Sequence, residues 1–352
     1  MQTISGLSNI LTYQFGPELH RQWNRSIVLG SMIDVKPGAG RDCSWAVAFS
    51  GAVADVASEG EDVADSELTN DTSEDAHLSW ATYRSSFQIS EQAIDAAASS
   101  NGDPEVLMDQ FGELVMNAGA AIAKKIEADL VTGTGTRSLR AQTINTIVGF
   151  LGGAIEASGA YAGLDPATYT EWAANVYENS SVDRPLTGEL LAQAARGVFD
   201  DTGVQFRGFI ATTQAIADKY EALWAQRLQT AAGGRADIGA TDLAWRGRPI
   251  VTSADITSGN ALLIDPGEVE IRFLPFRLEK YGTTREQALR FMAEVRRVAG
   301  TADGKSFNLT DLPLRIAILG KEGDSVKAEL RTTVQLVVKR RNRIARIGDI
   351  AE

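Results

Sequence analysis

The sequence is short of the residues on which most reactive sites are built. Among its 352 residues there are one cysteine, Cys43, and two histidines, His20 and His77. A single cysteine excludes an intramolecular disulfide and any metal cluster held by several cysteines of one chain. Two histidines exclude a histidine-rich metal site and leave few ways to build a Ser-His-Asp arrangement. The composition suits a reducing compartment and predicts neither a metal site nor a cofactor.

Long apolar runs and an excess of positive charge are also missing. No stretch approaches about 18 apolar residues, and residues 1–10 lack the basic and apolar regions of a signal peptide, so we predict no membrane-spanning helix and no export signal. Lys and Arg number 34 against 46 Asp and Glu, a net charge of −12. This balance disfavours a surface that binds nucleic acid all over, although a local basic patch stays open. Hydrophobic residues make up 44%, which is enough for a sizeable core.

The first part of the chain reads as an arm followed by a hairpin. Residues 1–42 have scattered apolar anchors, and we expect them to pack either on their own domain or on a neighbouring subunit. Alternating residues predict that 44–53 and 77–89 are the two strands of one long hairpin. The stretch 55–75 between them is acidic and has no Lys or Arg. It is solvated, docks on a basic surface of another subunit, or binds calcium, although no Asp-x-Asp-x-Asp-Gly loop is present.

The remainder alternates between helices and strands. Asp103 and Pro104 begin the clearest helix, whose apolar stripe runs from Leu107 to Leu130 and which ends near Gly133. Residues 285–298 fit a helix and a strand equally well. Other helices, opened by Ser or Thr, are predicted at 138–158, 187–200 and 213–228. Strands are predicted at 209–211, 249–252, 261–264, 269–276, 314–319 and 328–338.

No motif in the chain points to catalysis. The run Val131–Thr136 alternates Thr and Gly but lacks the Lys of a P-loop and follows a helix, so we interpret it as a helix C-terminal turn. Asp200 and Asp201 are adjacent and do not form an acid/base pair. No Gly-x-Ser-x-Gly elbow is present, and we interpret Cys43 as a small buried apolar residue. We therefore expect a protein that is not an enzyme.

Three stretches, taken in order with the arm, hairpin, long helix and α/β unit, resemble a known family. Tyr161–Trp172 is similar to an aromatic-rich Gly-Ile-Asp-Arg stretch, with Pro166 in place of the Arg. Thr241–Asp255 and Lys280–Leu312 are similar to later strands of the same family. The whole arrangement resembles the major capsid proteins of tailed bacteriophages, which have the Hong Kong 97-type fold.

The resemblance implies an α+β architecture with defined parts. These are an N-terminal arm (1–42), an extended E-loop hairpin with an acidic tip (43–90), a peripheral domain with a long spine helix (91–137), an axial α/β domain (138–265), and peripheral strands with the C-terminus (266–352).

The resemblance also implies a structural role. The protein self-assembles into hexamers and pentamers of an icosahedral shell, encloses double-stranded DNA without sequence specificity, and resides in the virion capsid after assembly in the host cytoplasm. Portal, scaffold and decoration proteins are further partners, and no membrane is involved. The chain has no Lys between Lys36 and Lys124, so a covalent cross-link from an E-loop lysine is excluded. Because the first 40 residues are not strongly helical, we expect no proteolytic trimming.

A subunit interface is predicted from the opposite charges of the acidic tip and the basic C-terminal region. The basic C-terminus faces either packaged DNA or a neighbouring tip. An encapsulin-type nanocompartment, a soluble α/β enzyme and a tail or surface-layer subunit are the competing interpretations. The interface residues of this hypothesis are Glu59, Glu61, Asp62, Asp65, Glu67, Trp80, Arg84, Arg296, Arg297, Lys339 and Arg341.

Overall fold

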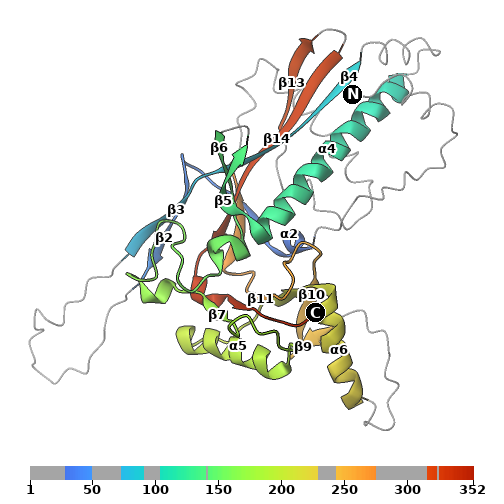
Figure 1. Ribbon diagram of the computed structural model, residues 1–352. Helices are drawn as coiled ribbons and strands as arrows, with labels where there is room; N and C mark the ends of the chain where they lie inside the picture. The colour runs from blue at the N-terminus through green and yellow to red at the C-terminus, as the bar shows by residue number, and fades with distance from the viewer. Residues whose placement is uncertain are drawn as a thin grey trace, which may run out of the picture.

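Two β-sheets and one long helix organise the chain (Figure 1). One hydrophobic core joins the long helix, the base of the hairpin and the first sheet, and a second lies between the second sheet and its two helices. The α+β class expected from the sequence is confirmed. The structure is a computed structural model that describes residues 28–49, 73–90, 104–139, 142–228, 243–274, 315–322 and 325–352.

The first sheet is built around one long strand, β14 (Ser325–Val338). Strands β13 (Arg315–Glu322) and β12 (Val269–Phe273) pair with successive parts of β14, and β4 (Ala81–Ser90) pairs with it over ten residue pairs. Strand β1 (Asp34–Pro37) adds to β12 in parallel. Segments from both halves of the chain therefore meet in one sheet.

The predicted spine helix is confirmed as α4 (Pro104–Thr132). Its 29 residues span about 43 Å, and the 14 residues of β14 span about 46 Å, so the helix and the strand match in length. The helix ends as predicted at Gly133, whose amide donates to the Asp129 carbonyl. A Cβ at Gly133 would lie 2.3 Å from the Ile147 carbonyl oxygen, so only glycine allows this close approach.

The helix predicted over 138–158 is wrong. The structure has a hairpin of β5 (Thr134–Leu139) and β6 (Gln142–Val148), followed by a short π-helix, η2 (Phe150–Ala154). Two physical causes explain the difference. The Thr-Ile-Asn-Thr-Ile-Val run of β6 is rich in β-branched residues, which favour strands, and three glycines between 149 and 153 oppose a regular helix.

The predicted long hairpin is correct for its first strand but not for its second. Strand β2 (Cys43–Ala48) pairs with β3 (Ser73–Leu78), and the chain then enters β4, which pairs with β14 instead. Glycines at 38 and 40 precede β2, and Gly40 has a φ of 98°, so β2 does not extend backwards to pair with β4. Figure 1 shows β2 and β3 projecting away from the β4–β14–β13 ribbon.

The second sheet is buried on both faces. Strands β8 and β11 are fully buried, and helices α5 (Gly188–Thr202) and α6 (Gln214–Leu228) cover one face, as predicted. The hydroxyls of Thr187 and Thr213 accept amide hydrogen bonds at the starts of the two helices. In order across the sheet, the strands are β7 (Asn175–Tyr177), β15 (Ala345–Ile347), β11 (Ala261–Ile264), β8 (Phe209–Thr212), β10 (Arg248–Thr252) and β9 (Ala244–Trp245).

The end of the chain belongs to this second sheet. Strand β15 lies between β7 and β11, so residues 345–347 do not join the peripheral strands as the expected 266–352 division had them. Conversely, β6 (residues 142–148) lies against α4 and the first sheet, although the expected 138–265 division grouped it with the second sheet. The chain therefore crosses between the two units more often than its linear order indicates.

Candidate assembly interface

Aromatic side chains fix the base of the projecting hairpin to the segment 161–172. The rings of Trp45 and Tyr161 lie 6.2 Å apart, and Phe49 stacks on Tyr169 at 4.3 Å. Phe49 also meets the edge of Trp172 at 5.9 Å. Such ring pairs contribute more than their buried area alone. The aromatic stretch 161–172 identified in the sequence is therefore the surface on which the base of the hairpin packs, and we call it the hairpin seat.

Polar contacts hold the same seat in register. The Tyr169 hydroxyl donates to the Glu74 carboxylate at 2.9 Å, and the His77 amide donates to the Ala162 carbonyl at 2.9 Å. Gly163 has a φ of 81° and passes under the His77 ring, where a Cβ would lie 2.7 Å from Cε1. The direction in which the hairpin leaves the subunit is therefore set by the subunit itself.

Arg341, expected at the interface, lies inside the subunit. Its side chain is fully buried against the rings of Tyr161 and Trp172, at 5.4 and 5.9 Å from the ring centroids. Burial lowers the pKa of the guanidinium to about 10, so it remains charged at neutral pH. The guanidinium donates to four carbonyl oxygens, those of Ala154 at 3.0 Å, Gly159 at 3.1 Å, Gly153 at 3.2 Å and Glu156 at 2.7 Å.

Lys339, also expected at the interface, belongs to an internal charge cluster around Glu270. Glu270 is 2% exposed, and it contacts Lys339 at 3.0 Å, Lys36 at 3.1 Å and Arg272 at 2.5 Å. Burial acts to raise the pKa of Glu270, but these three bonds outweigh it and hold the pKa below its ordinary value. Arg272 also donates to the Ser44 carbonyl at 2.9 Å. The cluster thus joins the arm, the hairpin and the end of β14.

The rest of the basic C-terminal region is likewise matched within the subunit. The opposite charges lie on two segments, at residue 178 and at residues 265–268, and they hold the end of the chain in place. The pairs are Arg340 with Glu268 at 2.5 Å, Arg343 with Asp265 at 3.1 Å, and Arg346 with Glu178 at 3.4 Å. The positive charge predicted for a partner is therefore largely neutralised inside the subunit.

The arm packs on its own subunit from residue 28 onward. The buried Glu127 carboxylate accepts hydrogen bonds from the amides of Val28, Leu29 and Gly30 at 2.7–3.0 Å, at the start of helix α2 (Leu29–Met32). Burial raises the pKa of Glu127, and the three amides oppose that rise. The sequence analysis missed Glu127 and Glu270, because other charged residues stand two positions away from each and the local sequence gives no sign that these acids are buried.

Two predicted interface residues lie on the described surface. Trp80 is half-buried, and its indole N–H donates to the Gly40 carbonyl at 3.3 Å. Arg84 is exposed on β4, directly opposite Arg331 of β14. The sequence placed Arg84 in the hairpin, whereas the structure places it on the first sheet. The remaining predicted members lie outside the described residues: Glu59, Glu61, Asp62, Asp65, Glu67, Arg296 and Arg297. So does the ambiguous stretch 285–298.

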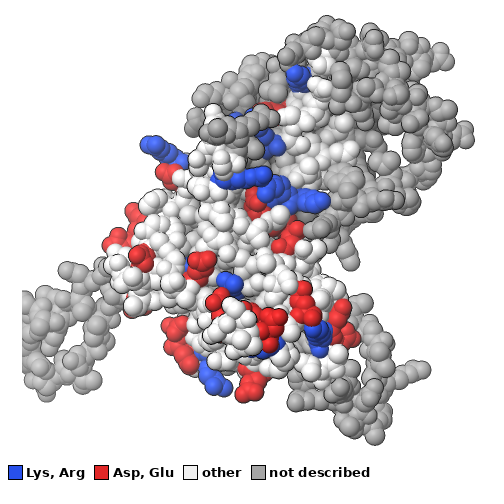
Figure 2. All heavy atoms as spheres, viewed as in Figure 1, with Lys and Arg blue, Asp and Glu red and all other residues white. Residues whose placement is uncertain are grey.

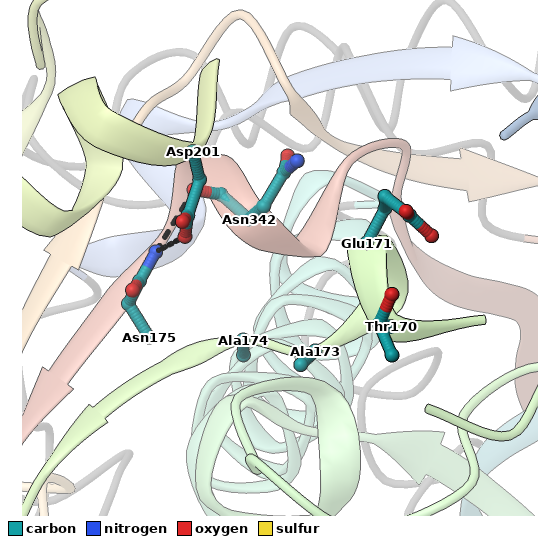
Figure 3. A pocket seen from close by; sticks show the side chains of 7 residues that line it. All are labelled: Thr170, Glu171, Ala173, Ala174, Asn175, Asp201 and Asn342. Atoms are coloured by element: carbon teal, nitrogen blue, oxygen red, sulfur yellow. Dashed lines mark hydrogen bonds between the residues drawn. The ribbon is translucent and has the colours of Figure 1, made fainter. Parts of the chain in front are cut away.

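One pocket of about 360 Å³ opens beside η3 (Thr170–Trp172) and the start of β7 (Figure 3). The Asn175 side chain donates to Asp201 at 2.9 Å and to the Asn342 carbonyl at 3.1 Å, and Glu171 lies on the opposite wall. Its lining holds no Ser, Cys or His nucleophile–base pair. The side chains that line the pocket therefore do not indicate a catalytic reaction.

The described residues contain neither a cluster of metal ligands nor a membrane-spanning helix. Among the residues that the structure describes, no three His, Cys, Asp or Glu side chains gather so as to hold a metal ion. No helix in the described ranges combines the length and apolar character needed to cross a membrane. Burial raises the pKa of the Cys43 thiol to about 11, which keeps it protonated, in line with the buried apolar role predicted for it.

Comparison with known proteins identifies the fold. No protein-family profile matches the chain, and no curated protein matches it. Among solved structures, a capsid subunit of cyanophage A-1(L) covers 100% of both chains with a TM-score of 0.72 at 18% identity. A capsid subunit of a native GTA particle has a TM-score of 0.57 at 11% identity and covers 96% of this chain and 95% of its own. An encapsulin from Synechococcus elongatus reaches 0.51 at 10% identity, covering 99% and 96%. The chain therefore has the fold of phage capsid subunits, the Hong Kong 97-type fold that its sequence resembles.

Proposed function

We propose that the chain is a major capsid protein that assembles into the icosahedral shell around the double-stranded DNA genome of a tailed bacteriophage. The observation that carries this proposal is the match over the full length of both chains to a cyanophage capsid subunit. The encapsulin match has the lower TM-score, 0.51 against 0.72, so a protein-filled compartment is the second candidate.

The projecting hairpin is the feature best suited to assembly. Its base is fixed by aromatic and polar contacts, while β2 and β3 carry the chain away from the body of the subunit (Figure 1). An element that leaves its own subunit adds contact area to each neighbour, and many modest interfaces repeated by symmetry close a shell. Hexamers and pentamers are the assemblies that we propose, located in the virion after assembly in the host cytoplasm.

Shell contacts in this proposal are non-covalent, and the protein needs no catalytic residue. The hairpin and its surroundings have no lysine between Lys36 and Lys124 to form a cross-link. The proposal includes DNA held inside the shell without sequence specificity. The net charge of −12 disfavours phosphate contacts over the whole surface of the chain. Portal, scaffold and decoration proteins complete the set of proposed partners.

Electron microscopy of the purified chain, alone and with a co-expressed scaffold, tests the proposal. The absorbance of any particles at 260 and 280 nm reports their content. Closed icosahedral shells that take up DNA are the expected result. Shells filled with another protein and free of nucleic acid favour the encapsulin alternative. A uniform monomer or dimer under all conditions, with turnover of a substrate, overturns the proposal.

A further inference from the structure

Two arginines face each other across the exposed side of the β4–β14 ribbon. Arg84 and Arg331 are directly opposite residues of the antiparallel pair, and both side chains are exposed. The adjacent Thr82 and Thr333 on the same face share a hydrogen bond of 3.2 Å, which fixes the register. Like charges directly opposite each other weaken a sheet. The pair therefore gives the isolated subunit no stability.

No negative charge within the described residues compensates this pair. Neither Arg84 nor Arg331 has a carboxylate within ion-pair distance there, although Glu329 lies on the same face of β14 two residues away. The arginines of the C-terminal region differ, because Arg340 and Arg343 are each matched by an acid of their own subunit. Figure 2 shows Lys and Arg side chains over the upper part of the described surface, and more Asp and Glu side chains over the second sheet below.

The same chain supplies a segment of complementary charge. Residues 50–72 contain seven Asp or Glu and no Lys or Arg. This segment connects β2 to β3, and these strands run away from the β4–β14 ribbon of their own subunit (Figure 1). A second copy of the chain therefore supplies a stretch whose charge is opposite to that of the arginine pair.

We propose that the Arg84–Arg331 pair binds the acidic segment 50–72 of a second copy of the chain. The inference rests on the proposed function, since it requires that copies associate. Each guanidinium offers a planar fork of donors, which matches a carboxylate better than the ammonium group of a lysine does. Acids at 59, 61 and 62 are spaced closely enough to engage both forks. The sequence analysis expected Lys339 and Arg341 to bind the acidic tip. This proposal assigns that role to Arg84 and Arg331 of the first sheet.

A binding measurement that needs no shell tests this pairing. A fluorescent peptide of residues 50–72 is titrated with the full chain, below the concentration at which light scattering detects particles. We expect R84E/R331E to bind roughly tenfold or more weakly than the wild type and binding to weaken as salt screens the charges. R84K/R331K keeps the charge but loses the fork, so we expect its binding to lie between those of the wild type and R84E/R331E. The control R196E/R207E changes two exposed arginines of the second unit and leaves binding unchanged. Equal binding by R84E/R331E and the wild type overturns the proposal.

A charge exchange tests the same contact during assembly. We expect R84E/R331E to form few particles, and E59K/E61K/D62K in the same chain to restore them. Particles of R84E/R331E that form normally overturn the inference and leave the proposed function intact. If the charge exchange does not restore assembly and the particles that form contain less DNA, the two arginines bind DNA phosphates, and the inference is also overturned. A wild-type chain that forms no particles contradicts the proposed function, while the peptide titration still decides the inference.

Discussion

Replacing Arg341 with Lys should destabilise the subunit although the charge is kept. The guanidinium donates to four carbonyls at 2.7–3.2 Å, one buried and three partly buried, which are spread around its planar fork. An ammonium group has three donors on one atom, so we expect at least two of these carbonyls to lose their partner. An unsatisfied buried polar group costs about 1–3 kcal/mol, so R341K should lower the free energy of unfolding by about 3 kcal/mol.

The Met variant separates geometry from charge. In R341M all four carbonyls lose their donor, but removing a buried cation returns a desolvation cost of several kcal/mol. We therefore expect R341M to be destabilised about as much as R341K. If the positive charge itself were what stabilises this site, R341K would behave as the wild type and R341M alone would be damaged.

Thermal and urea unfolding of the unassembled subunit measure the effect. With an unfolding entropy of about 2.1 cal/mol/K per residue, 352 residues give about 0.7 kcal/mol/K, so 3 kcal/mol corresponds to a Tm lower by about 4 °C. Tryptophan fluorescence is the probe, because the Trp172 ring lies 5.9 Å from the guanidinium carbon. The control R196K changes an exposed arginine. An R341K transition within about 0.5 kcal/mol of the control refutes the reasoning.

Three other substitutions test the arm, the charge cluster and the hairpin seat. Glu127→Gln places an amide donor against the arm's own amides, so we expect a loss of about 1–3 kcal/mol and faster hydrogen exchange at Gly30. Glu270 has a lowered pKa, so its ionised form stabilises the folded state at neutral pH, and this stabilisation is lost as the pH falls below about 4. E270Q should therefore be less stable than the wild type at pH 7, and its free energy of unfolding, measured with urea, should depend less on pH in the acid range. Gly163→Ala places a side chain at a φ of 81° and against the His77 ring, so it should lower the free energy of unfolding, measured with urea, by about 1–3 kcal/mol. Adding H77A should remove the clash with the ring but not the backbone strain, and should recover only part of this loss.

The elements that sequence reasoning predicted correctly are those whose local signals agree with their surroundings. Helix α4 has a Pro at its first turn, a continuous apolar stripe and a glycine where it ends, and all three indicate the same limits. Strand β8 is buried on both faces, so its apolar run was sufficient. In β6 the helix prediction depended on a Ser cap at the start of the 138–158 stretch, whereas the β-branched composition indicated the strand that forms.

Strand partners and buried charges could not be predicted in the same way. The alternation of β4 indicates a strand but does not say whether β2, as predicted, or β14 lies beside it, because pairing between distant segments leaves no local pattern. The sequence shows that Arg341 is charged but not that it is buried, since its hydrogen bonds are accepted by backbone carbonyl oxygens, which every residue type has. A cluster of basic residues in sequence is therefore weak evidence for a basic surface.

Three arginines of this chain show how differently a positive charge can be placed in one subunit. Arg341 is held by neutral carbonyls in the core, and Arg343 is held by an acid of its own subunit. Arg84 instead faces another arginine on an exposed strand, with no acid in ion-pair distance among the described residues. This pair leaves positive charge available to a partner and, unlike the exposed Arg196 and Arg207, places two arginines at directly opposite positions of a sheet. Arg84 stands far from the basic C-terminal cluster in the sequence, whereas Arg331 stands just before it. Where a subunit satisfies its own charges, the unsatisfied ones indicate where a second molecule binds.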